Sequence, residues 1–232
     1  LRCLVGSEMC IRDRIYTVIG FGLAGYSVIG NDSIQTLGTF IASKQKWFKW
    51  YVLASAASFV MILALAWGWY SYNGDISYGR LTRIPYQEIQ WYHAVAPAIL
   101  LVLTRVGIPV STTFLVLSAF ASTVVLEKML MKSVVGYGLA AMVAYVCWIV
   151  VSRFINEKFD EVKGDFWISF WRNSVWVTSG WLWWVWLSHD VANIAVYLPR
   201  QLSIELLIVV MAYFTILLLS LIHISEPTRH RR

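Results

Sequence analysis

Residues 50–70 form an uninterrupted apolar run, WYVLASAASFVMILALAWGWY, with aromatic residues at both ends. At about 1.5 Å per residue, a helix of this length matches the roughly 30 Å hydrocarbon core of a bilayer. Trp50 and Tyr51 mark one end, and Trp69 and Tyr70 mark the other. Such residues are typical of the aromatic belts at the two membrane interfaces. The run therefore predicts a transmembrane helix.

The composition extends this prediction to the whole chain. Apolar residues (AVILMFWYC) make up 59% and charged residues 14% of the 232 residues, whereas a soluble domain has about 45–50% and about 25%. A soluble globule has too little interior to bury so much apolar surface. We therefore expect an all-α polytopic membrane protein in the plasma or inner membrane. The composition excludes a nucleic-acid module and a disordered chain, and three Cys are too few for a disulfide scaffold.

Other apolar stretches predict further membrane segments. Residues 134–152 and 203–219 are each long enough for one span. Residues 91–126 contain two shorter apolar stretches that meet at Arg105–Pro109. This pattern predicts either two spans or one re-entrant hairpin.

The two ends of the sequence do not continue the pattern of their neighbours. Residues 1–14 and 220–232 resemble the translation of a sequencing adapter, the alternative being a charged tail at each end. We leave both stretches out of the fold prediction. Of the three Cys and four His, only Cys147, His93 and His189 then remain. These are too few for a disulfide or for a histidine-rich iron site, and we do not expect an enzyme.

Two longer apolar segments are each interrupted by polar residues. Asp32 interrupts residues 15–43, and Asp190 interrupts residues 166–200. Each segment is too long for one straight span and too short for two, which predicts a membrane helix broken at its carboxylate. A charge at the bilayer centre costs roughly 2.5–3.5 kcal/mol, so it persists where it faces a cavity or a partner. Both residues are therefore candidates for function.

The two interrupted segments resemble each other. Asp32 and Asp190 lie 158 positions apart, and an amide follows each after three residues, as Gln35 and Asn193. A clear span follows in both cases. Broken helices in corresponding positions of two repeats are typical of the binding sites of secondary transporters. The alternative is a coincidence of one carboxylate and one amide.

Loop charges give the orientation of these repeats. With Lys44, Lys46 and Lys49 placed inside, the two interrupted segments enter the membrane from opposite sides. The sequence thus predicts an inverted-repeat transporter. Its first repeat covers residues 15–157 and its second residues 158–219.

The second repeat is expected to be incomplete. At the same offset of 158, the counterpart of residues 111–113 falls beyond residue 232. We therefore expect the gene to continue with a second motif of that kind.

Three polar stretches combine hard oxygen ligands with hydroxyl donors. Carboxylate and amide oxygens suit a small cation such as Na⁺ or a proton, whereas Ser and Thr hydroxyls and free N–H groups after Pro109 suit an oxyanion. We expect a cation at Asp32, Gln35 and Asp190. We expect the anion at Asn31, Ser111, Thr112, Thr113 and Asn193. The alternative for the hydroxyls is hydrogen bonding within their own helix.

These motifs resemble those of the inorganic phosphate transporter (PiT) family. That family carries Gly-Ala-Asn-Asp-Val-Ala-Asn-Ala in each inverted half, followed by Pro-Val-Ser-Thr-Thr-His. Here Asn31-Asp32 is similar to the first motif, Asp190–Asn193 to its second copy, and Pro109–Thr113 to the later motif. The resemblance covers most of residues 15–219.

The chain departs from the family pattern at four positions. Gly30 replaces Ala, Gln35 replaces Asn, His189 replaces Asn and Phe114 replaces His. The resemblance implies symport of phosphate, or in some members sulfate, with Na⁺ or H⁺ and no other cofactor. The departures also permit a non-transporting paralogue that acts as a membrane sensor or scaffold.

Three other features of the sequence also predict a role or a location. His189 is either a proton relay beside Asp190 or a polar cap. The Trp-rich surface of residues 167–186 faces either lipid or a second copy in a homodimer. His93, next to Trp91 and Tyr92, is expected at the membrane interface.

Overall fold

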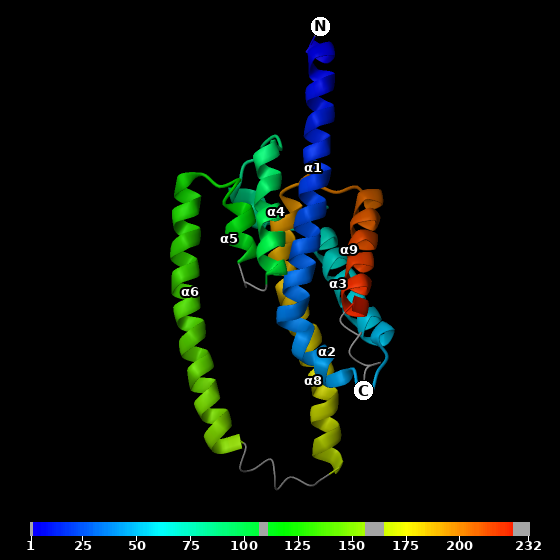
Figure 1. Ribbon diagram of the computed structural model, residues 1–232, viewed down its shortest axis with the longest axis vertical. Helices are drawn as coiled ribbons and strands as arrows, with labels where there is room; N and C mark the ends of the chain where they lie inside the picture. Colours follow the sequence, from blue (N-terminus) through cyan, green and yellow to red (C-terminus); the bar gives the residue numbers. More distant parts are fainter. Residues whose placement is uncertain (1, 107–110, 156–164, 225–232) are drawn as a thin grey trace. The chain divides into compact units, whose positions relative to one another are not determined.

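The computed structural model describes residues 2–106, 111–155 and 165–224, and every regular element in these ranges is helical (Figure 1). The elements are α1 (Arg2–Asp32), a π-helical segment (Ser33–Leu37), α2 (Gly38–Lys44), α3 (Trp50–Ser71), a 3-10 turn (Arg80–Arg83), α4 (Trp91–Arg105), α5 (Thr112–Leu117), α6 (Thr123–Val150), a second π-helical segment (Val151–Ile155), α8 (Asp165–Ala195) and α9 (Ile204–Ile224). The predicted all-α class is confirmed for the described residues.

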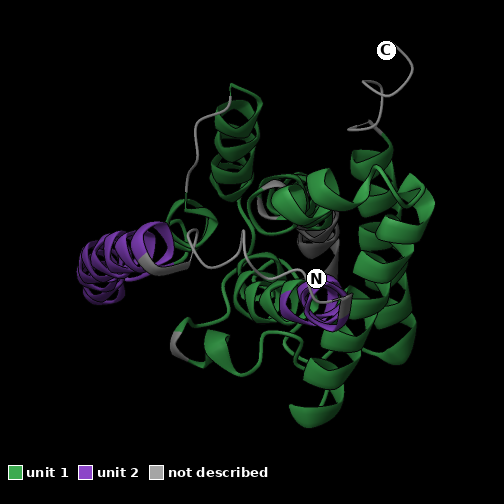
Figure 2. Ribbon diagram, turned by 90° about the horizontal axis from the view of Figure 1, so that it is seen from below, with its two compact units in different colours: residues 1–120, 179–232 green, residues 121–178 purple. Residues whose placement is uncertain are grey.

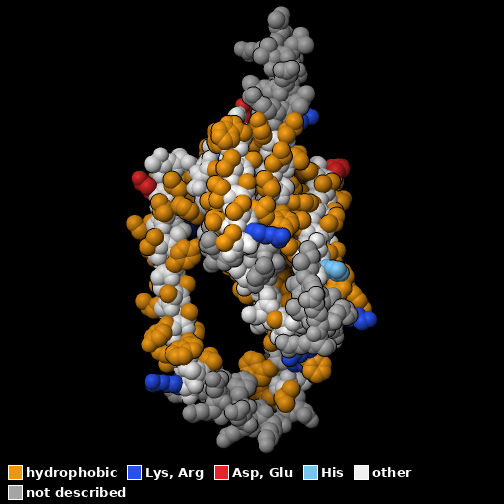
Figure 3. Space-filling model, viewed as in Figure 1, with side chains coloured by type: hydrophobic (Ala, Val, Ile, Leu, Met, Phe, Trp, Pro, Cys, Tyr) orange, Lys and Arg blue, Asp and Glu red, His pale blue; other side chains and the backbone are white. Residues whose placement is uncertain are grey.

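Three of the described helices are long and apolar enough to cross a membrane. They cover Trp50–Ser71, Thr123–Arg153 and Ile204–His223. The first two contain the predicted spans 50–70 and 134–152, and the third contains the predicted span 203–219 except its first residue. On the face seen in Figure 3, hydrophobic side chains cover most of the described helical surface. Both observations support a membrane protein.

The chain divides into two compact units, coloured separately in Figure 2. Unit 1 comprises residues 1–120 and 179–232, and unit 2 comprises residues 121–178. Helix α8 contributes its first part to unit 2 and its second part to unit 1. All the motif residues that the sequence singles out belong to unit 1.

Unit 1 is built around α1, which packs against α4 and α9, while α3 packs against α9. The second half of α8 joins this core through Trp183, whose side chain is fully buried. Its indole Nε1 donates a hydrogen bond of 3.1 Å to the carbonyl oxygen of Ala57 in α3. Tyr213 in α9 similarly donates from its hydroxyl to the Gly22 carbonyl in α1, over 2.7 Å.

A glycine allows α1 to meet the end of α8. A Cβ atom on Gly20 would lie 2.6 Å from Cε1 of Tyr197, closer than any real contact. Small residues of this kind let membrane helices approach closely. The ring of Tyr197 is therefore fixed against the backbone of α1.

Helices α4 and α5 form a hairpin, which distinguishes between the two predictions for residues 91–126. Helix α4 has 15 residues and α5 has six. At about 1.5 Å per residue, neither reaches the roughly 30 Å that a span requires. The chain runs along α4 and returns along α5, which packs against it (Figure 1). The structure therefore favours the re-entrant hairpin.

Unit 2 contains α6 and the first part of α8. None of the described residues of α6 is buried. Several of its apolar side chains, among them Val134, Leu139 and Val143, are more than half exposed. Such a surface is stable when lipid covers it.

The interruption predicted near Asp32 takes the form of a π-helical segment. Helix α1 continues through Asp32, and the backbone then widens over Ser33–Leu37 before α2 begins at Gly38. Short π-helical stretches inside α-helices are frequent at functional sites. The helix changes its geometry here without ending.

The second predicted break does not exist, because α8 runs without interruption from Asp165 to Ala195. The polar side chains make hydrogen bonds without opening the helix. Ser188 donates from Oγ to the Val185 carbonyl over 2.8 Å, and Asp190 accepts from neighbouring side chains. Hydropathy cannot distinguish this arrangement from a break, since both place polar residues in an apolar run.

Helices α1 and α9 extend into the terminal stretches set aside in the sequence analysis. Helix α1 begins at Arg2, and α9 continues to Ile224. The ring of His223 packs edge-on against Trp50, with centroids 4.7 Å apart.

Candidate functional site

The structure brings two of the three sequence motifs together in one polar cluster. The cluster consists of Thr112 and Thr113 at the start of α5 and Asp190 and Asn193 in α8. The Thr112 hydroxyl donates to Oδ1 of Asp190 over 3.2 Å, and the Thr113 hydroxyl reaches the same atom over 3.5 Å. We call these four residues the Thr–Asp–Asn cluster.

Asn193 completes the cluster from one helical turn after Asp190. Its Nδ2 donates to Asp190 Oδ1 over 2.9 Å and lies 3.1 Å from the hydroxyl oxygens of both Thr112 and Thr113. Asn193 is fully buried, and Asp190 and Thr112 are each 4% exposed. Three of the four side chains are thus buried, whereas Thr113 reaches the same atoms from an exposed position.

Two oxygen atoms in this cluster have no donor. Asp190 Oδ2 and Asn193 Oδ1 are buried and make no hydrogen bond within the described residues. A buried charge or acceptor without a partner is strongly unfavourable. Both oxygens therefore retain the capacity to accept a hydrogen bond or to ligate a small cation.

Ser111 occupies a different position from the one predicted. It is the N-cap of α5, and its Oγ accepts a hydrogen bond from the Phe114 N–H over 3.3 Å. This is the usual role of a Ser at a helix start. The predicted anion contact of Ser111 therefore competes with a capping bond. Residues 107–110, which include Pro109, lie outside the described part of the chain.

The first motif forms its own hydrogen bond at the start of the π-helical segment. Gln35 Nε2 donates to Asn31 Oδ1 over 3.0 Å. Asn31 is 7% exposed, whereas Gln35 is exposed. The side chain of Asp32 lies outside the described part of the chain, so its predicted cation contact stays a prediction.

His189 lies next to Asp190 in sequence but not in the cluster. Its ring is exposed, and Nδ1 lies 2.9 Å from the Val185 carbonyl oxygen. A carbonyl accepts, so Nδ1 carries the proton in this contact. Because α8 is continuous here, His189 does not cap a helix break, and its role as a proton relay stays a prediction.

The base of the α4–α5 hairpin forms a buried junction that was not predicted from the sequence. His93 was expected at an interface, but it is 1% exposed and its ring stacks on Phe120, with centroids 4.2 Å apart. Tyr197 donates from its hydroxyl to the His93 carbonyl over 2.7 Å. The spacing of Gln90 and His93 is that of a capping box, which could have indicated the buried ring.

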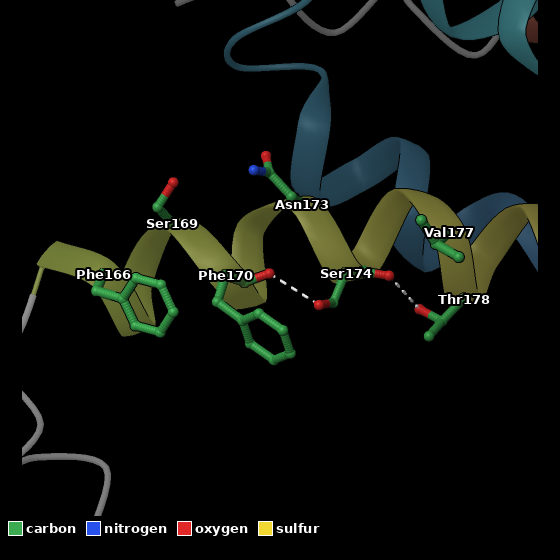
Figure 4. A pocket seen from close by; sticks show the side chains of 7 residues that line it. All are labelled: Phe166, Ser169, Phe170, Asn173, Ser174, Val177 and Thr178. Atoms are coloured by element: carbon green, nitrogen blue, oxygen red, sulfur yellow. Dashed lines mark hydrogen bonds between the residues drawn. The ribbon is translucent and has the colours of Figure 1, made fainter.

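A separate pocket lies along the first part of α8, in unit 2 (Figure 4). Its volume is about 510 Å³, and it is lined by Phe166, Ser169, Phe170, Asn173, Ser174, Val177 and Thr178. The hydroxyls of Ser174 and Thr178 donate to carbonyls of the same helix. No predicted site residue lines this pocket.

Neither a metal-ligand cluster nor a similarity to known proteins assigns a function to the described residues. Among the described residues, no group of three or more His, Cys, Asp or Glu could hold a metal ion. No protein-family model, curated protein or solved structure matches the chain.

Proposed function

We propose that this chain is a cation-coupled transporter of an inorganic oxyanion, with phosphate as the substrate and Na⁺ or H⁺ as the coupling ion. The carrying observation is the Thr–Asp–Asn cluster, in which residues about 80 positions apart meet inside a protein with membrane-length helices. Buried ionisable groups within membrane proteins usually mark ion or substrate pathways. The resemblance of the same residues to the PiT family points to the same function.

The evidence for a cation site is the pair of oxygens that receive no hydrogen bond. A carboxylate and an amide carbonyl are ligands that hard cations prefer. Asp190 Oδ2 and Asn193 Oδ1 are of these types, and both are buried. A cation or proton there neutralises the carboxylate.

The anion half rests on the two threonine hydroxyls. In the present arrangement, Thr112 and Thr113 both point at Asp190 Oδ1. When a cation neutralises Asp190, the carboxylate accepts weaker hydrogen bonds from the two threonine hydroxyls. The hydroxyls then become available to an oxyanion. Cation and anion then bind together because each favours the other, as linkage requires.

The architecture that accompanies this function is the inverted repeat. We assign the π-helical interruption after Asp32 and the polar turn at Asp190 to corresponding positions of the two halves. Lipid surrounds the spans, and the plasma or inner membrane is the site of action.

Uptake into proteoliposomes tests the proposal. The full-length protein is reconstituted, and labelled phosphate uptake is followed with an inward Na⁺ gradient, an inward proton gradient, or neither. We expect uptake to require one of the two gradients, and excess unlabelled phosphate or sulfate identifies the preferred anion by competition. A Glu205→Gln variant serves as the control, because this exposed carboxylate lies outside the cluster. Uptake equal to that of empty liposomes under all three conditions contradicts the proposal.

A further inference from the structure

The base of the α4–α5 hairpin is held together by side chains from its two ends. Gln87, just before α4, donates from Nε2 to the Phe120 carbonyl over 3.0 Å. The His93 ring stacks on the Phe120 ring, with an interplanar angle of 9°. The residues that open and close the hairpin are thus joined directly.

The hydrogen bonds of His93 define its protonation state. The Gln90 backbone N–H donates to Nδ1 over 2.9 Å, so Nδ1 is an acceptor and carries no proton. The Gln90 side chain in turn accepts from the His93 backbone N–H, which completes a capping box. The imidazole at this position is therefore neutral.

The surroundings of the ring oppose a positive charge. The rings of Tyr92 and Phe120 contact it, and Tyr197 binds its carbonyl. Two titratable side chains, Tyr92 and Tyr197, thus contact His93 among the described residues. Burial lowers the pKa of His93, although the nearby Ala119 carbonyl, not well aligned with Nε2, opposes this in part.

Protonation would break the closing contact. A proton on Nδ1 would face the Gln90 N–H, replacing a hydrogen bond with a repulsion between two donors. The charged ring would also lose solvation without gaining a partner. Both effects favour a state in which His93 leaves Phe120 and becomes hydrated.

The hairpin base and the Thr–Asp–Asn cluster share one short segment. Thr112 begins α5, and Phe120 follows only eight residues later. Val116, between them, is fully buried. Loss of the Phe120 contact therefore loosens the segment that presents Thr112 to Asp190.

We propose that His93 is a pH-sensitive positioning residue whose neutral ring keeps the hairpin closed and Thr112 and Thr113 on Asp190. Acidification protonates the ring and opens the hairpin. The consequence for transport rests on the proposed function, but the opening itself does not.

Cysteine accessibility tests the opening without measuring transport. Val116→Cys reports on the buried face of α5, and Val106→Cys, at a position 69% exposed, is the matched reference. Both are made in a chain in which Cys3, Cys10 and Cys147 are replaced by Ser. Maleimide labelling rates are compared at about pH 5.5 and about pH 7.5, on either side of the usual histidine pKa. Their ratio cancels the pH dependence of thiol reactivity.

We expect the ratio of Val116→Cys to Val106→Cys labelling to rise by up to about tenfold at the lower pH, because pH 5.5 lies about one unit below the usual histidine pKa and protonation favours the open state. His93→Gln should abolish the rise, because Gln keeps the capping-box acceptor but does not titrate. A flat ratio in the parent chain, or an equal rise in His93→Gln, overturns the proposal.

A second variant keeps the test decisive if His93→Gln does not fold. Phe120→Leu leaves His93 titratable but removes the stacked ring, so the labelling transition should move to higher pH. A labelling transition at the same pH as in the parent chain overturns the proposed role of His93. A pH-dependent ratio together with no phosphate uptake under any gradient supports the role of His93 and contradicts the transport function.

Discussion

The hydroxyl oxygen of Thr112 lies 3.2 Å from Oδ1 of Asp190, although the two residues are 78 positions apart. This contact links the re-entrant hairpin to α8. The same Thr112 oxygen lies 3.1 Å from Asn193 Nδ2, so one hydroxyl both donates and accepts. Removing it leaves two buried groups with fewer partners.

Thr112→Val should therefore destabilise the protein. The variant keeps the side-chain shape but removes the hydroxyl, and we expect a cost of about 1–3 kcal/mol. Thermal unfolding in detergent measures the loss. Thr104→Val is the matched control, since the Thr104 hydroxyl donates only to Leu100 in its own helix, and it should cost less. Equal effects would show that the contact with Asp190 adds nothing.

Asp190→Asn should abolish uptake and leave membrane insertion intact. The substitution removes the charge that binds the coupling cation, while the cost of placing a charge in the membrane also disappears. Asp32→Asn should behave in the same way. Uptake and the yield of membrane-inserted protein are measured side by side, and full uptake by either variant refutes the cation assignment.

Trp183→Ala should cause a large loss of stability. The side chain is fully buried and its indole donates to Ala57, so truncation leaves a cavity and removes a bond between helices. We expect a cost of about 3–5 kcal/mol. Trp181→Ala, at a position 69% exposed, should unfold close to the parent chain. A denaturation midpoint equal for the two variants contradicts the described packing of α8 against α3.

We expect the Tyr78 hydroxyl to ionise at a higher pH than an ordinary tyrosine. Its hydroxyl donates to the Ala64 carbonyl over 2.6 Å, and burial, with a smaller effect from Tyr72, raises its pKa to about 12. Because the neutral form is favoured in the folded protein, its contribution to stability is full below pH 10 and is lost as the pH rises towards 12. Difference absorbance of the parent chain and Tyr78→Phe isolates the transition, and ionisation near pH 10 excludes the burial described here.

Hydropathy predicted the elements that depend on length and composition alone. Residues 50–70 became α3 because an unbroken apolar run of this length has one stable form in a bilayer. The motifs assigned the hydroxyls after Pro109 and Asn193 to one anion site, and Thr112 and Thr113 do lie within hydrogen-bond distance of Asn193. The hydrogen bond from Thr112 to Asp190 was not predicted, and the anion itself stays a prediction.

Elements that depend on tertiary partners were not predictable in this way. Asp190 reads as a helix break in the sequence, yet Thr112 and Asn193 satisfy Oδ1 while the helix continues. His93 reads as an interfacial residue because its neighbours are Trp91 and Tyr92. Its burial depends on Phe120, which is distant in the sequence.

The continuity of α8 makes it a mechanical element. Residues 179–195 of this helix lie in unit 1 and carry both Trp183 and Asp190 on one continuous helical backbone. A twist of the helix at Trp183, where its indole is bonded to α3, is therefore transmitted along the following turns as torsion. It arrives as a change in the direction in which the Asp190 carboxylate points, and the hydrogen bonds of the cluster tolerate only a small rotation before they break.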